Sequence, residues 1–289
     1  MRTRLISAIC TTLSDDGSLH LEGLAAHLED QWRHGMSGVL IGGTMGVMQL
    51  LPDATYRDLV RHGTQLARGR GEVLMGAGDT SFARTLERVR YVEQFDVDGI
   101  VVLSPFFLTL SQAELIDYFQ QLADLSSKPL YLYDLPGATK TKLTLETVLA
   151  LSRHPNIRGI KCSGDWTDTW RLIRRVDTTF RVVPAQPQMV DLLVRCGVPH
   201  NLDGIFGIVP ELAASIVEAA EQGDHAVAAM WQEKLSDLLQ LLRNEYPLFP
   251  ACSALLNARG VPGNVFMAPT RPLSPEQREQ LLTAFTGLI

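Results

Sequence analysis

The sequence predicts an α/β protein, a (β/α)8 or TIM barrel with a helical C-terminal appendage. Eight short apolar or β-branched runs alternate with longer segments in which apolar residues recur every three or four positions. The short runs are apolar throughout, as is typical of parallel strands covered by helices. No Gly-x-Gly-x-x-Gly follows the first run, which disfavours an open dinucleotide-binding sheet.

The strands are expected, in chain order, at residues 4–10, 38–42, 72–77, 99–104, 129–133, 157–161, 180–185 and 202–206. Amphipathic segments between them, such as 21–35, 54–69 and 112–127, predict helices. After about residue 222 only helical patterns remain, at 225–246 and 274–289. We therefore expect a barrel over residues 1–222 and a helical region over 223–289 that packs on it.

Composition excludes several classes of function. The net charge of −6 provides no basic surface for nucleic acid or anionic lipid. The four cysteines form no Cys-x-x-Cys and the seven histidines no His-x-x-x-His, so we expect no metal site and no disulfide framework. The N-terminal apolar run is interrupted by Thr11, Thr12 and Asp15, which argues against a signal or membrane segment. We expect a cytoplasmic protein with reduced thiols.

In a barrel of this kind the chemistry lies at the C-terminal ends of the strands and in the loops that follow. Lys161 ends the sixth expected strand, in "IRGIKCSGDW". Burial of a lysine favours its neutral form, which attacks carbonyls to form a Schiff base. The alternative is a strand-end lysine that caps a carbonyl or extends to water, and position alone favours that alternative.

Two neighbouring strand ends carry possible partners for Lys161. Tyr133 ends the fifth expected strand, where its phenol is a candidate proton shuttle, although a single aromatic residue there is more often a packing residue. "GGTMG", residues 42–46, follows the second strand, and its backbone N–H groups are suited to hold a carboxylate beside Thr44. A glycine-rich turn needed for geometry alone explains that loop about equally well.

Four motifs in order resemble the dihydrodipicolinate synthase/N-acetylneuraminate lyase family of Schiff-base aldolases and lyases. They are "GGTMG" for Gly-(Thr/Ser)-Thr-Gly-Glu, "SPFF" for Ser/Thr-Pro-Tyr-Tyr, "YDLPG" for Tyr-Asn-x-Pro, and "GIKCSGD" for Gly-x-Lys-(Glu/Asp)-x-(Ser/Thr)-Gly-Asp. Each lies at the end of an independently expected strand, and the resemblance covers nearly the whole chain. The resemblance makes a catalytic Lys161 the favoured interpretation.

The resemblance implies roles for individual residues. Lys161 would form the imine with pyruvate or another 2-oxo acid, Tyr133 would transfer protons, and Thr44 would relay them. Substrate contacts would come from Gly43, Met45, Phe107, Ala138, Ala185 and Leu202. The resemblance implies no metal and no organic cofactor, and it implies self-association, as a homotetramer (a dimer of dimers) or a homodimer.

Departures from the family pattern argue against dihydrodipicolinate synthase itself. Met45 replaces the second hydroxyl residue and Val47 the glutamate. Phe106 and Phe107 stand where many members have two tyrosines, so the hydroxyl given by a neighbouring subunit is missing. Ala138 replaces the arginine that binds the second substrate's carboxylate, which removes a charge-assisted contact. The "YDLPGAT" pattern is closer to the 2-keto-3-deoxygluconate aldolase branch.

These departures predict a more apolar substrate than a sugar acid. Asp134 replaces the usual asparagine and is expected to alter the charge around Tyr133, and "AQPQM", residues 185–189, differs from the usual Ser-Gly start. We expect a 2-oxo acid with few hydroxyls and an apolar or aromatic tail. The alternatives are 4-hydroxy-tetrahydrodipicolinate synthase itself, a barrel that has lost catalysis and only binds a metabolite, and a phosphosugar barrel.

Overall fold

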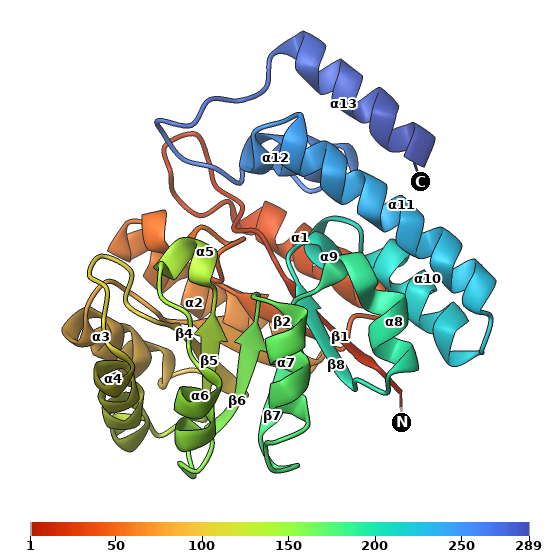
Figure 1. Cartoon of the computed structure of the whole chain (residues 1–289). Helices are drawn as coiled ribbons and strands as arrows, with labels where there is room; N and C mark the ends of the chain where they lie inside the picture. Colours follow the sequence, from red (N-terminus) through yellow and green to blue (C-terminus); the bar gives the residue numbers. More distant parts are fainter. Residues whose placement is uncertain (1, 289) are drawn as a thin grey trace. The chain divides into compact units, whose positions relative to one another are not determined.

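The computed structural model describes residues 2–288, which fold as two compact units (Figure 1). The first unit contains residues 2–71 and 187–288. In it the parallel strand β1 (Arg4–Ala8) lies between β2 (Gly38–Ile41) and β8 (His200–Asp203). Its helices are α1 (Leu21–Arg33), η1 (Met48–Leu50), α2 (Asp53–Ala67), η2 (Pro187–Met189), α8 (Val190–Arg195), α9 (Ile205–Ile208), α10 (Pro210–Glu221), α11 (His225–Asn244), α12 (Leu248–Ala258) and α13 (Pro275–Leu288).

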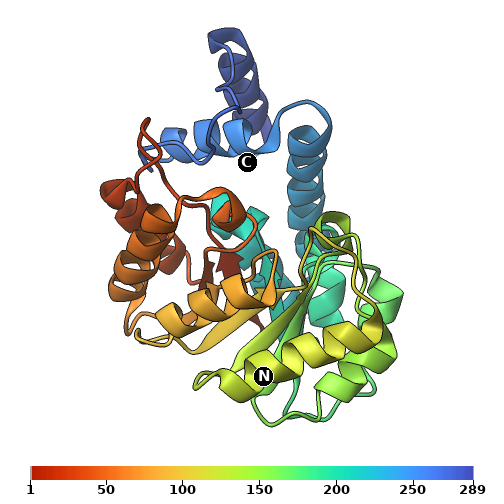
Figure 2. The ribbon, with the colours of Figure 1, turned by 90° about the vertical axis from the view of Figure 1, so that its left-hand side faces the viewer.

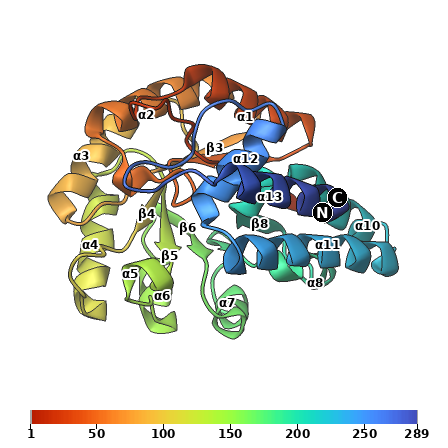
Figure 3. The same ribbon diagram turned by 90° about the horizontal axis from the view of Figure 1, so that it is seen from above.

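The second unit, residues 72–186, is a parallel sheet with helices beside it. Its strands are β3 (Glu72–Gly76), β4 (Gly99–Leu103), β5 (Leu130–Asp134), β6 (Ile157–Cys162) and β7 (Arg181–Pro184). Its helices are α3 (Phe82–Val92), α4 (Gln112–Leu125), α5 (Pro136–Thr139), α6 (Leu145–Leu151) and α7 (Trp166–Ile173). Helices α4, α6 and α7 lie on one side of β4, β5 and β6 (Figure 3).

The order of the strands confirms the predicted fold class. They are arranged as β7-β6-β5-β4-β3-β2-β1-β8, so each strand from β1 to β6 neighbours the next one in sequence and β1 also neighbours β8. Helices connect successive strands, as parallel pairing requires. This is the strand order of a (β/α)8 barrel.

Seven of the expected strands lie within two residues of their predicted limits, and the eighth does not. It was expected at 202–206 and is found at His200–Asp203. Ile205 and Phe206 belong to α9 instead, because the Asp203 side chain accepts a hydrogen bond from the backbone N–H of Ile205 at 3.0 Å and turns the chain into that helix. The apolar pair Ile205–Phe206 has no periodicity by which a strand and a buried helical turn could be distinguished.

The C-terminal helices share a core with α10 in the first unit. Leu212 and Ile216 of α10 belong to the same buried cluster as Leu235 and Leu238 of α11. Residues of α12 and α13, including Leu255 and Leu281, extend this cluster, and Figure 2 shows α11 and α12 as consecutive blue helices. Apolar burial therefore stabilises the helical segment expected from the sequence, while the domain boundary at residue 222 remains a prediction.

His27, in α1, is a fully buried histidine that accepts a hydrogen bond from the backbone N–H of Cys10 at 3.2 Å. Burial lowers the pKa of His27 to about 4, although the nearby Asp30 opposes this shift. Between pH 6.5 and 4 the unfolded chain therefore binds a proton at this residue that the folded protein excludes.

We expect the free energy of unfolding to fall as the pH drops through this range. At about pH 4.5 the wild type should lose roughly 2.5 kcal/mol more, relative to about pH 7.5, than the variant His27→Gln, which stays neutral. Urea unfolding at the two pH values measures this difference. Equal losses in both proteins would show that His27 does not govern the acid sensitivity.

Among residues 2–288 no helix is both long and apolar enough to cross a lipid bilayer.

Candidate active site

Tyr133 and Lys161 lie beside each other at the C-terminal ends of two paired strands. In the β5–β6 pair Tyr133 is in register with Lys161, and Asp134 with Cys162. Both Tyr133 and Lys161 are buried, with 5% and 6% of their surfaces exposed. Because side chains alternate along a strand, Tyr133 and Lys161 project from one face of the sheet and their successors from the other.

The Lys161 amine lies over the face of the tyrosine ring. Its Nζ atom is 3.8 Å from the centre of the Tyr133 ring and donates a hydrogen bond to Ser163 Oγ at 3.3 Å. The structure shows no hydrogen bond from Lys161 to the Tyr133 hydroxyl. A protonated amine at this position would be attracted electrostatically to the face of the ring, and the contact does not use the Tyr133 hydroxyl.

The turn after Lys161 is held from two neighbouring strands. The backbone N–H of Ser163 donates to the carbonyl of Asp134 at 2.9 Å, and Gln186 Nε2 donates to the carbonyl of Gly164 at 2.5 Å. The backbone N–H of Ala185, a predicted substrate contact, donates to the carbonyl of Cys162 at 2.8 Å. These bonds fix the backbone on both sides of the lysine, so its side chain starts from a defined position.

Asp165 caps α7, the helix that follows this turn. Its side chain accepts from the backbone N–H of Asp168 in the first turn of α7. Trp166 and Trp170 lie on the same helix with ring centres 5.6 Å apart, which agrees with a packing role.

The loop of residues 43–46, in the first unit, contains an unpaired buried hydroxyl. Thr44 Oγ1 is buried and has no hydrogen-bond partner among the residues that the structure describes. The backbone N–H groups of Thr44 and Met45 likewise have no acceptor in the described part of the chain. The Thr11 hydroxyl donates to the carbonyl of Gly46 at 2.6 Å and holds the loop to the end of β1. A buried donor without a partner costs free energy, so these groups are suited to donate hydrogen bonds to an anionic ligand.

Met45 packs against the end of β8. A methyl group added at Gly204 would lie 2.1 Å from Met45 Cγ, so the absence of a side chain at 204 makes room for Met45. Leu202, a predicted substrate contact, is 1% exposed on the same strand end. Val47 closes the loop with φ +47°, a left-handed conformation that is rare for a β-branched residue and costs about 1–3 kcal/mol.

The other predicted contacts lie on the second unit at differing depths. Phe106 is half-buried after β4, while Phe107 is 80% exposed beside the exposed Leu108. Ala138 is exposed on the short helix α5. No group of three or more His, Cys, Asp or Glu side chains suited to a metal ion occurs among residues 2–288.

A model of the dihydrodipicolinate synthetase family matches residues 1–287. The chain belongs to this family. The 4-hydroxy-tetrahydrodipicolinate synthase of Exiguobacterium sp. is 29% identical over 285 residues, which cover 98% of this chain and 97% of that protein. The synthase of Xanthomonas campestris pv. campestris is 30% identical over 271 residues, covering 93% and 89% of the two chains.

Solved structures of similar proteins have the same fold. The prophage protein YagE of E. coli, a family member solved in complex with pyruvate, superposes with a TM-score of 0.91 at 26% identity and covers 99% of this chain and 98% of its own. A variant of the Sulfolobus solfataricus 2-keto-3-deoxygluconate aldolase reaches a TM-score of 0.89 at 20% identity, over 99% and 96% of the chains. At that identity the second likeness concerns the fold alone.

Sequence reasoning did not select Ser163, Gln186 or Lys142, which contact the surroundings of Lys161 and Tyr133. Ser163 is two residues from Lys161, so proximity in sequence was an available signal. Gln186 follows the seventh strand, and only the fold brings it to the turn at Gly164. Lys142 is eight residues from Asp134, but Asp134 lies on β5 and Lys142 follows α5, so no regular spacing within one element brings them together.

Proposed function

We propose that this protein is a lyase or aldolase, or a dehydratase, that forms a Schiff base between Lys161 and pyruvate or another 2-oxo acid. The observation that carries the proposal is the buried Lys161 amine, 3.8 Å from the centre of the Tyr133 ring, at the paired ends of β5 and β6. In a (β/α)8 barrel the strand ends at this face are where catalytic groups occur. Membership of the family supports the same assignment.

In the proposed reaction the neutral Lys161 amine attacks the C2 carbonyl of the acid. Tyr133 then donates a proton to the hydroxyl group of the carbinolamine, which leaves as water. For a substrate with a hydroxyl at C4, the Tyr133 phenolate then takes the proton of that hydroxyl, and the protonated imine accepts the electron pair of the C3–C4 bond as it breaks, which gives an enamine and an aldehyde. Protonation of the enamine and hydrolysis of the imine regenerate the lysine.

The loop of residues 43–46 is proposed to hold the carboxylate of the substrate. The Thr44 hydroxyl and the N–H groups of Thr44 and Met45 are the donors for this contact, and all three lack partners among the described residues. Thr44 also passes protons between the substrate and Tyr133 in this scheme. Leu202, Ala185, Ala138 and Phe107 are the proposed contacts for the remainder of the substrate.

The substrate is proposed to carry an apolar or aromatic tail rather than several hydroxyls. Met45 and Val47 place apolar side chains in the loop that would hold the carboxylate, and Ala138 offers no charged group for a second carboxylate. A hydroxyl without a partner in such a site would lose its hydrogen bonds to water, which disfavours sugar acids.

A second candidate is 4-hydroxy-tetrahydrodipicolinate synthase, the activity named for relatives that are 29% and 30% identical to this chain. This candidate requires the condensation of pyruvate with aspartate semialdehyde. Ala138 disfavours it, because no charge-assisted contact to the semialdehyde carboxylate is available there. An assay with both compounds separates the candidates.

The test of the proposal is trapping of the imine. Wild-type protein is incubated with pyruvate and borohydride, and peptide mass spectrometry should find the reduced adduct on Lys161. A panel of 2-oxo acids, with polyhydroxylated, aliphatic and aromatic tails, then identifies which compound turns over. The absence of any adduct in folded protein across the panel would favour a metabolite-binding barrel, and turnover of polyhydroxy acids alone would overturn the proposed tail.

Self-association is part of the proposal. Phe107 and Leu108 expose 80% and 65% of their surfaces after β4, and apolar side chains exposed in sequence neighbours favour burial between copies. We propose a homodimer or a homotetramer built from dimers, located in the cytoplasm.

A further inference from the structure

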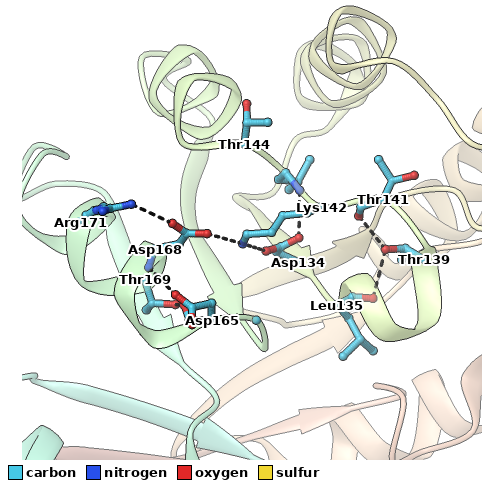
Figure 4. Close-up of polar contacts among 12 residues, drawn as sticks. Asp134, Leu135, Thr139, Thr141, Lys142, Thr144, Asp165, Asp168, Thr169 and Arg171 are labelled. Atoms are coloured by element: carbon cyan, nitrogen blue, oxygen red, sulfur yellow. Dashed lines mark hydrogen bonds and ion pairs between the residues drawn. The ribbon is translucent and has the colours of Figure 1, made fainter.

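Asp134, the residue after Tyr133 on β5, forms an ion pair with Lys142 (Figure 4). Lys142 Nζ donates to Asp134 Oδ2 at 2.8 Å, and the backbone N–H of Leu143 donates to Asp134 Oδ1 at 3.0 Å. Both carboxylate oxygens are therefore occupied by the segment that follows α5. The Asp134 side chain is 3% exposed and that of Lys142 is 35% exposed, so water screens this pair less than a surface pair.

The ion pair joins three elements around the candidate active site. Asp134 follows Tyr133 on β5, and its carbonyl accepts from Ser163 in the turn after Lys161. Lys142 Nζ lies so near that turn that a methyl group added at Gly164 would be 3.2 Å from it. Helix α5, which carries Ala138, immediately precedes the segment of Lys142 and Leu143. One contact thus links the ends of β5 and β6 to the loop proposed to face the substrate.

The lysine of this pair carries its charge at neutral pH. Partial burial acts against the charged form, but the hydrogen bond and the negative charge of Asp134 outweigh it and raise the pKa of Lys142. Cys162, in register with Asp134 on β6, lies in the field of Asp134, Lys142 and Lys161 together, and its own pKa is raised to about 12, mainly by burial. A change of charge at Asp134 or Lys142 is therefore expected to alter the electrostatic potential at the strand end that carries Lys161.

We propose that Asp134 and Lys142 are positioning residues that hold Tyr133 and Lys161 in place and keep the region behind them electrically neutral. This inference rests on the proposed function of Lys161. It also accounts for Asp134 at a position where asparagine is usual in the family pattern, because the added negative charge is matched by Lys142.

Removing one residue of the ion pair leaves the charge of the other unbalanced. The two single variants are therefore expected to have opposite effects on the protonation of Lys161. The variant Asp134→Asn leaves the cation of Lys142, which disfavours a proton on Lys161, so imine formation should begin at lower pH. The variant Lys142→Met leaves the anion of Asp134, which favours that proton, so imine formation should begin at higher pH. The other ionisable groups on the elements of this unit around Lys161 are Tyr131 and Tyr133 on β5, Arg158 and Cys162 on β6, Asp165, Asp168 and Arg171 on α7 and its cap, and Arg181 on β7.

The experiment measures the rate of borohydride-trapped imine formation with pyruvate as a function of pH. We expect the pH at half-maximal rate to move by roughly half a unit, downward in Asp134→Asn and upward in Lys142→Met. The double variant Asp134→Asn/Lys142→Met is neutral at both positions, so its midpoint should return to that of the wild type. The maximal rate should fall roughly tenfold or more in each single variant, because the strand ends are no longer held.

Asp134 and Lys142 line a cavity of about 440 Å³, and Asp168 and Arg171 line it too. The exposed Arg171 provides a matched control. Arg171 and Asp168 are 61% and 43% exposed, 3.5 Å apart, so Arg171→Gln should change neither the midpoint nor the maximal rate. Thermal unfolding of each variant distinguishes a protein that no longer folds from one in which only Tyr133 and Lys161 are displaced.

The outcomes distinguish this inference from the function on which it rests. Midpoints that move in opposite directions support it, as does their return in the double variant. If the wild type forms the adduct and both single variants keep its midpoint, or move in the same direction, the positioning role is overturned and the Schiff base stands. If the wild type forms no adduct with any 2-oxo acid, both proposals are overturned.

Discussion

The variant Lys161→Ala is expected to lower kcat/KM at least about a thousandfold, the order of loss seen when an enzyme's covalent nucleophile is removed. Alanine cannot form an imine, so the substrate loses the electron sink that permits carbon–carbon cleavage. Steady-state kinetics with the best substrate of the 2-oxo acid panel measures the loss, and no borohydride adduct should form in this variant.

Two further variants are needed to interpret the loss of activity in Lys161→Ala. Tyr133→Phe keeps the ring over which the amine lies and removes only the hydroxyl, so the adduct should still form while turnover falls by about 10²- to 10⁴-fold. Lys128→Ala removes a lysine that precedes β5, at the end of the strand opposite to Tyr133, and should leave kcat/KM unchanged. Adduct formation in Lys161→Ala at the wild-type rate would place the reactive amine elsewhere.

The variant Arg259→Met is expected to lower the free energy of unfolding by about 3 kcal/mol, because it leaves two carboxylates without their cation. Arg259, at the C-terminal end of α12, lies 2.9 Å from Asp30 of α1 and 2.5 Å from Glu211 of α10. The side chains of Arg259 and Asp30 are only 13% and 10% exposed. The Glu211 side chain is 30% exposed and therefore still contacts water. We therefore expect the loss of unfolding free energy to lie at the lower end of the range for buried pairs.

Urea unfolding measures this loss, and a surface pair provides the control. Arg70 and Glu29 are 3.1 Å apart with 44% and 50% of their side chains exposed, so Arg70→Met should cost less than about 1 kcal/mol. If the two variants lost equal stability, the buried network would contribute no more than an ordinary surface pair. The comparison also reports how firmly α12 is attached to α1 and α10, since Arg259 forms ion pairs with both helices.

Much of the fold was predictable because its signals are local. Continuous apolar runs marked the strands, and the change of period between runs marked the helices, so the fold class followed from counting units. The limits of the eighth strand were wrong because the hydrogen bond from Ile205 to Asp203, and not the apolar pattern, ends that strand. Hydrophobicity alone cannot distinguish a short buried strand from a short buried helix.

The sequence by itself determined that Lys161 and Tyr133 end neighbouring strands, because chain order and strand order coincide in this fold. Only the tertiary structure decided where the amine lies, over the ring of Tyr133 and toward Ser163. It also decided that the charge of Asp134 is met by Lys142, and that Gln186 holds the turn at Gly164. Such contacts depend on loop conformation and side-chain direction, which no periodic pattern encodes, since residues with no regular spacing meet only after the strands have paired.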